Sequence, residues 1–166
     1  MELEENGLYV IKDSYFSDFK DKHLMLNKLE NRPYFYALKE SDNIFWMIPL
    51  SSKVENYQTK IKKHEAKYGR GKCVFYHIGK MMGKESVFLV GSTIPVSPKY
   101  IKQAYTIRGI PYVIESQALL NDIKRKHKKY LTLVKQKQLR PIFSQFMTSC
   151  FINFLRKFCV FWGPWI

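Results

Sequence analysis

Carboxylates are scarce in this sequence: 14 Asp and Glu stand against 28 Lys and Arg, leaving a net charge of +14. Long apolar runs are also missing, since none reaches the roughly 18 residues that a membrane-spanning helix needs. The three cysteines, Cys73, Cys150 and Cys159, are odd in number and show no metal-ligand spacing. These absences argue against a disulfide-stabilised scaffold or a zinc site, and they predict reduced thiols.

A secretory signal is lacking at the start of the sequence, because Met1-Glu2-Leu3-Glu4-Glu5 is acidic where such a signal is basic and then apolar. We therefore expect a cytoplasmic protein that does not associate with a membrane. The positive charge is concentrated after residue 42: residues 1–42 hold nine acidic and six basic side chains, and the rest hold five and 22. A segregated positive surface of this kind predicts a nucleic-acid partner.

Three familiar catalytic patterns are incomplete. The segment His64-Glu65-Ala66-Lys67-Tyr68 begins like a zinc-protease motif, but Tyr68 stands where the second His is required. The segment Gly69-Arg70-Gly71-Lys72-Cys73 is too short for a phosphate-binding P-loop. No pair of carboxylates is spaced for a two-magnesium site. We therefore expect neither a metal nor another cofactor.

Short apolar runs separated by polar turns predict an α+β protein. Strands are expected at 8–11, 33–38, 44–48, 75–78 and 86–90, and helices at 55–68 and 116–137, with a brief helix starting at residue 13 or 14. The strand at 44–48 should stop at Pro49, and 94–98 should be a connection. Because no βαβ rhythm repeats, we predict a small antiparallel, partly closed β-barrel with added basic helices.

The chain length of 166 residues and the apolar content of 46% predict one packed domain, which we place at residues 1–141. Residues 142–166 form an apolar tail in which Arg156 and Lys157 are the charged side chains. We expect this tail to be a terminal helix that docks on the core or on a partner subunit. A membrane-surface helix or a non-native extension are the alternatives.

The segment Pro49-Leu50-Ser51-Ser52-Lys53 is the best candidate for chemistry, because it lies between a strand and a basic helix. Its hydroxyls, its charged Lys53 and the first amides of the helix can bind an anion, although two serines before a helix are also a common cap. Such groups suffice for metal-free RNA cleavage, in which the RNA 2′-OH is the nucleophile. His64 or Tyr15 would complete the acid–base pair, unless His64 is an ordinary, partly buried helical histidine.

Basic residues on both long helices are candidates for binding RNA, with a solvated helix face as the alternative. The candidate contacts are Lys60, Lys62, Lys63, Lys67, Arg70, Lys72, Lys124, Arg125 and Lys128. Arg32 would contact a phosphate and Tyr36 would stack on a base. For these two residues the alternative is an ordinary aromatic strand.

The order of these segments resembles the ToxN/AbiQ-like toxins of type III toxin–antitoxin systems, especially the CptN branch. The likeness is carried by Ile48–Lys53, Phe75–Gly79, Ile94–Val96 and the long basic helix, and it runs from about Leu8 to Pro141. It implies a MazF/Kid-like barrel and an endoribonuclease that cuts its own pseudoknotted antitoxin RNA from a repeat array. Ser51, Ser52 and Lys53 match the family's catalytic positions by residue type, but ToxN has a proline between Ser and Lys that this chain lacks.

We therefore predict a metal-independent endoribonuclease toxin that leaves a 2′,3′-cyclic phosphate and a 5′-hydroxyl. Its partners would be cellular RNA as substrate and the antitoxin RNA as inhibitor, in a protein–RNA hetero-oligomer. Two alternatives stay open. One is a MazF-like mRNA interferase with a protein antitoxin, and the other is a non-catalytic RNA-binding module.

Overall fold

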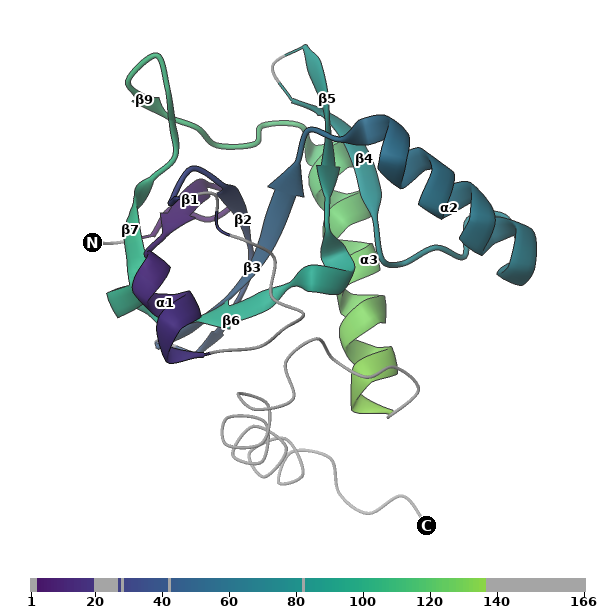
Figure 1. Ribbon diagram of the computed structural model, residues 1–166, viewed down its shortest axis with the longest axis horizontal. Coiled ribbons are helices and arrows are strands. Elements are labelled where there is room, and N and C mark those ends of the chain that lie inside the picture. The colour runs from purple at the N-terminus through teal and green to yellow at the C-terminus, as the bar shows by residue number, and fades with distance from the viewer. Residues whose placement is uncertain (1–2, 20–26, 28, 42, 82, 137–166) are drawn as a thin grey trace.

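The computed structural model describes residues 3–19, 27, 29–41, 43–81 and 83–136 (Figure 1). Within these ranges the protein is α+β, as predicted, with helices α1 (Asp13–Asp18), α2 (Val54–Tyr68) and α3 (Gln117–Lys135). None of the helices in this part of the chain combines the length and apolar character that a membrane crossing needs. The predicted domain boundary at residue 141 and the tail at 142–166 lie outside the described residues.

An antiparallel sheet forms the body of the molecule. Its seven strands in the described ranges are β1 (Leu8–Ile11), β2 (Pro33–Ser41), β3 (Ile44–Ser51), β4 (His77–Met81), β5 (Lys84–Phe88), β6 (Ile94–Val96) and β7 (Ile101–Ala104). They pair in the order β4-β5-β3-β2-β1-β7, and β6 pairs with β3. Because the edge strands β4 and β7 do not pair with each other, this sheet is open, and the predicted barrel is not confirmed.

A short ribbon and two 3₁₀ turns complete the described elements. The ribbon consists of β8 (Thr106–Ile107) and β9 (Ile110–Pro111), and the turns are η1 (Val90–Ser92) and η2 (Pro98–Tyr100). The turn η1 connects β5 to β6, which pair with opposite ends of the same edge of β3. The chain therefore brings the β4–β5 hairpin to the end of β3 that precedes α2.

Strand β3 corrects two predictions. It does not stop at Pro49 but continues to Ser51, because the Pro49 carbonyl accepts a hydrogen bond from the Leu89 amide (3.0 Å) and Ser51 pairs with Val87. Residues 94–96, expected to be a connection, form β6 and pair with the first half of β3. Both differences arise from backbone pairing between segments distant in the chain, which local composition does not reveal.

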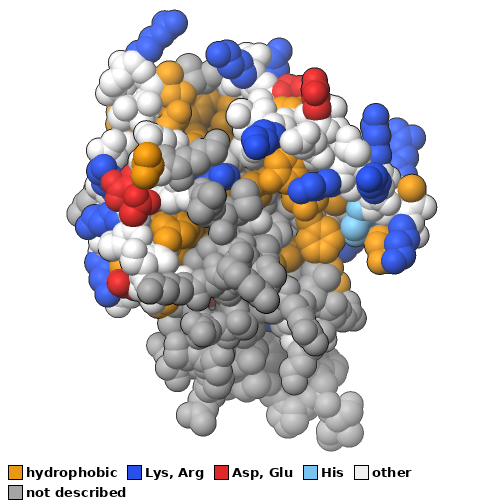
Figure 2. Space-filling model, viewed as in Figure 1, with side chains coloured by type: hydrophobic (Ala, Val, Ile, Leu, Met, Phe, Trp, Pro, Cys, Tyr) orange, Lys and Arg blue, Asp and Glu red, His pale blue; other side chains and the backbone are white. Residues whose placement is uncertain are grey.

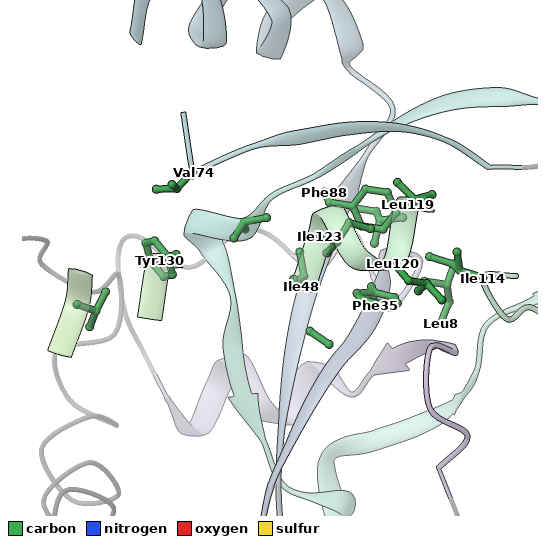
Figure 3. Packing of buried hydrophobic residues seen from close by; sticks show 14 residues of the cluster. Leu8, Phe35, Ile48, Val74, Phe88, Ile114, Leu119, Leu120, Ile123 and Tyr130 are labelled. Atoms are coloured by element: carbon green, nitrogen blue, oxygen red, sulfur yellow. The ribbon is translucent and has the colours of Figure 1, made fainter. Parts of the chain in front are cut away.

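Two hydrophobic clusters make up the core. In the first, shown in Figure 3, Leu119, Leu120 and Ile123 of α3 lie beside Phe35 and Phe88 of the sheet. The second cluster contains the aromatic and aliphatic side chains Tyr9, Ile11, Tyr15, Tyr34, Met47 and Tyr100. Since the neighbours Leu8 and Tyr9 belong to different clusters, β1 is buried on both faces, which accounts for its unbroken apolar run.

Candidate functional site

A cavity of about 600 Å³ lies at the end of β3, and we call it the Ser51 cavity. The β4–β5 hairpin and the β8–β9 ribbon both contribute to its wall, and Figure 1 shows them projecting from the same side of the molecule. Its polar lining residues are Asn31, Arg32, Ser51, Ser52, Lys84, Ser86, Tyr105, Arg108 and Tyr112. Among the described residues that line it there is no carboxylate, so its chemistry suits an anion.

Ser51 and Ser52 both line this cavity. Strand pairing with Val87 fixes the backbone of Ser51, whose side chain is buried and whose Oγ accepts a hydrogen bond from the Lys53 amide (3.3 Å). The residue at the cap position of α2 is Lys53, whose side chain makes no capping hydrogen bond. The Ser52 side chain is exposed. The two serines therefore lie at a cation-lined opening, and the Ser51 hydroxyl also supports the turn that leads into α2.

Arg32 lies beside these serines. Its side chain is only 5% exposed, and Nη1 donates a hydrogen bond to the carbonyl oxygen of Leu50 (2.9 Å), the residue before Ser51. This bond holds the Arg32 guanidinium next to the end of the strand that carries Ser51. A cation in such a poorly solvated position acts on an anion more strongly than one in bulk water. The predicted phosphate contact at Arg32 thus shares a cavity with Ser51 and Ser52.

Lys53, in contrast, does not line the cavity, although it is adjacent to Ser52 in sequence. It is exposed at the start of α2, and its carbonyl accepts the Tyr57 amide (3.4 Å). Its side chain is therefore exposed to solvent outside the described cavity wall.

Tyr15 and Tyr36 do not belong to the candidate site. Tyr15 has no exposed surface, and its hydroxyl donates a hydrogen bond to the Pro95 carbonyl (2.9 Å) inside the second cluster. Tyr36 is 5% exposed, and its ring packs against that of Phe45 with centroids 5.3 Å apart. Burial also raises the pKa of Tyr36. In this conformation Tyr15 is closed to substrate and Tyr36 cannot stack on a base, because the core encloses both rings.

His64 packs on the inner side of α2. Its ring centroid lies 4.6 Å from that of Tyr68 and 5.3 Å from that of Phe75. His64 is half-buried, and it is absent from the lining of the Ser51 cavity. This placement corresponds to the alternative of a partly buried helical histidine, and it gives no support to an acid–base role in that cavity.

Helix α2 carries the main basic surface, and it has no fully buried residue. We call the following exposed residues of α2 and of the loop after it the α2 basic surface: Lys60, Lys62, Lys63, Lys67, Arg70 and Lys72. In Figure 2, Lys and Arg side chains (blue) gather over α2 at the right and over the ends of the two hairpins at the top. Helix α2 begins directly after Lys53, so the chain runs from the two serines of the Ser51 cavity into the helix that carries this surface.

The basic residues predicted on α3 are placed elsewhere. Lys124 Nζ forms an ion pair with Glu5 (2.7 Å), and Arg125 forms one with Asp122 (2.6 Å). Lys124 and Lys128 line a separate cavity of about 440 Å³, to which Glu5 also contributes. Neighbouring carboxylates thus reduce the local positive charge, and these three residues do not extend the Ser51 cavity.

Sequence reasoning missed Lys84, Arg108 and the two tyrosines of the cavity. Arg108-Gly109 between Ile107 and Ile110 is a turn-like pattern that could have indicated a hairpin. No local pattern, however, shows that this hairpin ends near Ser51.

No group of three or more His, Cys, Asp and Glu side chains in the described ranges is arranged to hold a metal ion. Comparison of the chain with protein-family models and with curated proteins finds no match.

Proposed function

We propose that this chain is a metal-independent endoribonuclease toxin of the cytoplasm. The observation that carries the proposal is the Ser51 cavity, in which two serines meet three cationic side chains and no lining carboxylate in the described part of the chain. The α2 basic surface supports it, because phosphates along an RNA strand bind to rows of lysine. The net charge of +14 favours the same class of partner.

Each group in the cavity has a use in RNA cleavage. The RNA 2′-oxygen attacks the adjacent phosphorus and gives its proton to a water molecule, while the bond from phosphorus to the 5′-oxygen breaks and the 5′-oxygen takes up a proton. The products are a 2′,3′-cyclic phosphate and a 5′-hydroxyl. The hydroxyls of Ser51 and Ser52 would orient the phosphate, and Arg32 would stabilise the added negative charge of the phosphorane. Lys84 would donate a proton to the leaving 5′-oxygen.

The resemblance to ToxN/AbiQ-like toxins extends this proposal to the partner. The inhibitor would be a pseudoknotted antitoxin RNA that the toxin itself processes, held in a protein–RNA hetero-oligomer. RNA bound across the α2 basic surface would cover the opening of the Ser51 cavity. The partly closed, MazF/Kid-like barrel implied by the same resemblance also belongs to the proposal.

One observation favours a second candidate, a non-catalytic RNA-binding module. Lys53, His64 and Tyr15 were the residues expected to complete the catalytic site, and all three lie outside the cavity lining. A protein of this kind would bind RNA through the same cations and leave it uncut.

A cleavage assay with matched serine variants separates the two candidates. Ser51→Ala removes a cavity hydroxyl, and Ser116→Ala removes a serine that makes a comparable bond elsewhere, since its Oγ accepts the Leu119 amide (3.4 Å). We expect wild type and Ser116→Ala to convert labelled RNA into fragments with cyclic-phosphate ends. Ser51→Ala should cut roughly 10²–10³-fold more slowly, as expected for loss of one preorganised donor. Binding without cleavage by the wild type would establish the second candidate instead.

A further inference from the structure

Arg108, at the tip of the β8–β9 ribbon, has a backbone conformation that is unfavourable for an arginine. Ile107 pairs with Ile110, so Arg108 and Gly109 form a two-residue loop, and their φ angles are 53° and 79°. A loop with both φ angles positive favours Asn-Gly, because most L side chains clash with the backbone in the left-handed region. Gly109 satisfies this requirement, whereas Arg108 does not. The fold thus holds an arginine where asparagine would be more stable.

The ribbon is held firmly at its base. The Tyr105 amide donates to the Leu8 carbonyl (2.8 Å), the Leu8 amide to the Tyr112 carbonyl (3.0 Å), and the Tyr112 amide to the Tyr105 carbonyl (2.9 Å). Both tyrosines also pack against the first hydrophobic cluster. These contacts join the ribbon to the buried strand β1 and fix the position of its tip. Arg108, at the tip of this anchored ribbon, lines the wall of the Ser51 cavity.

Among the residues that the structure describes, no side-chain hydrogen bond or ion pair involves Arg108. It is exposed, and none of the acidic side chains in the described ranges forms an ion pair with it. A strained backbone conformation at a residue whose side chain makes no stabilising contact within the described part of the fold is typical of functional positions. The other cavity cation with a guanidinium, Arg32, comes from the start of β2, so two guanidinium groups from separate elements line one opening.

We propose that Arg108 is a substrate-contacting residue that binds an RNA phosphate at the mouth of the Ser51 cavity. This inference rests on the proposed RNA function and names a residue for it. A guanidinium binds two phosphate oxygens at once through its planar fork, which a lysine ammonium cannot do. The β8–β9 ribbon would thereby contribute a second contact to the RNA strand, in addition to the α2 basic surface.

The proposal makes stability and binding change in opposite directions. Arg108→Asn relieves the left-handed strain, so its Tm should rise by about 2–4 °C, the shift that roughly 1 kcal/mol gives in a chain of this size. Its affinity for a single-stranded 2′-O-methyl RNA, which lacks the attacking hydroxyl, should fall about tenfold or more. The slope of log affinity against log salt should flatten by about 0.7. Arg108→Lys should keep the salt slope and lose part of the affinity.

Lys129→Gln is the charge-matched control. Lys129 is exposed on α3 and lines none of the cavities described above, so its loss should leave the affinity close to that of the wild type. An Arg108→Asn protein that binds this RNA as tightly as the wild type would overturn the inference. A fall in its Tm would do so as well, because it would show that Arg108 supports the fold. Arg108→Gly, which also tolerates positive φ, repeats the binding test if the asparagine variant does not fold.

The two proposals fail in different ways. A wild-type protein that binds the 2′-O-methyl RNA but never cuts unmodified RNA would contradict the endoribonuclease, while Arg108 would still be tested by binding. If Arg108→Asn binds and cleaves RNA like the wild type while Ser51→Ala cleaves slowly, the proposal for Arg108 is wrong and the endoribonuclease proposal stands. If the wild type did not bind the probe at all, the Arg108 proposal would be wrong.

Discussion

His127 should make the stability of this protein depend on pH. It lies on α3 with 3% of its surface exposed, and its Nε2 is 3.2 Å from Thr93 Oγ1. The Thr93 hydroxyl donates its proton to the Met47 carbonyl (3.2 Å), so we assign Nε2–H of the neutral ring as the donor to Thr93. Burial lowers the pKa of His127 to about 4.

The size of the effect follows from the two pKa values. An unfolded histidine titrates near pH 6.5, so between about pH 6.5 and pH 4 the unfolded chain binds a proton at His127 that the folded protein does not. The contribution of His127 is fully present above pH 6.5 and is lost as the pH falls towards 4. Between pH 7.5 and pH 5 the free energy of unfolding should drop by about 2 kcal/mol on account of this residue. Burial also lowers the pKa of His77, which adds a loss of the same sign.

Urea unfolding of the wild type and of His127→Gln between pH 7.5 and pH 5 isolates this contribution. Glutamine keeps an N–H donor for Thr93 but does not titrate, while His77 and the carboxylates are common to both proteins. We expect the wild type to lose about 2 kcal/mol more than the variant over this range, whatever their difference at pH 7.5. Parallel stability curves for the two proteins would refute the reasoning, since they would mean that His127 titrates alike in both states.

Three further predictions concern packing, RNA and metal. Gly79→Ala should destabilise the protein by about 1–3 kcal/mol in thermal unfolding, because a Cβ there would clash with Leu119 Cδ1; Leu119→Ala should recover part of the loss, and additive effects would contradict the contact. Replacing Lys62, Lys63 and Lys67 together by Gln should flatten the salt dependence of RNA binding by about two to three units, and an unchanged slope would place the RNA away from α2. Cleavage should continue undiminished in EDTA, whereas activity that disappears and returns with magnesium would reveal a metal site.

Local patterns were sufficient for several elements. The hairpin at 33–38 and 44–48 and the helices at 55–68 and 116–137 appear as β2–β3, α2 and α3, with small shifts at their ends. These segments carry their own periodicity and turn residues. Ser116 shows this for α3, because its Oγ accepts the Leu119 amide and starts the helix where the sequence indicated. The strands that were not predicted, β6, β7, β8 and β9, are two to four residues long and depend on pairing with a partner strand.

The sequence by itself determined the charge of the protein, its α+β class and the position of two adjacent serines at the end of a strand. Only the tertiary structure decided which side chains meet those serines. Arg32 lies near the serines because β2, which follows it, pairs with β3, and Lys84 lies there because β5 pairs with the last residues of β3. Arg108 arrives because the base of its ribbon is bonded to β1. These pairings are long-range hydrogen bonds made under a shared core, so spacing along the chain does not report them.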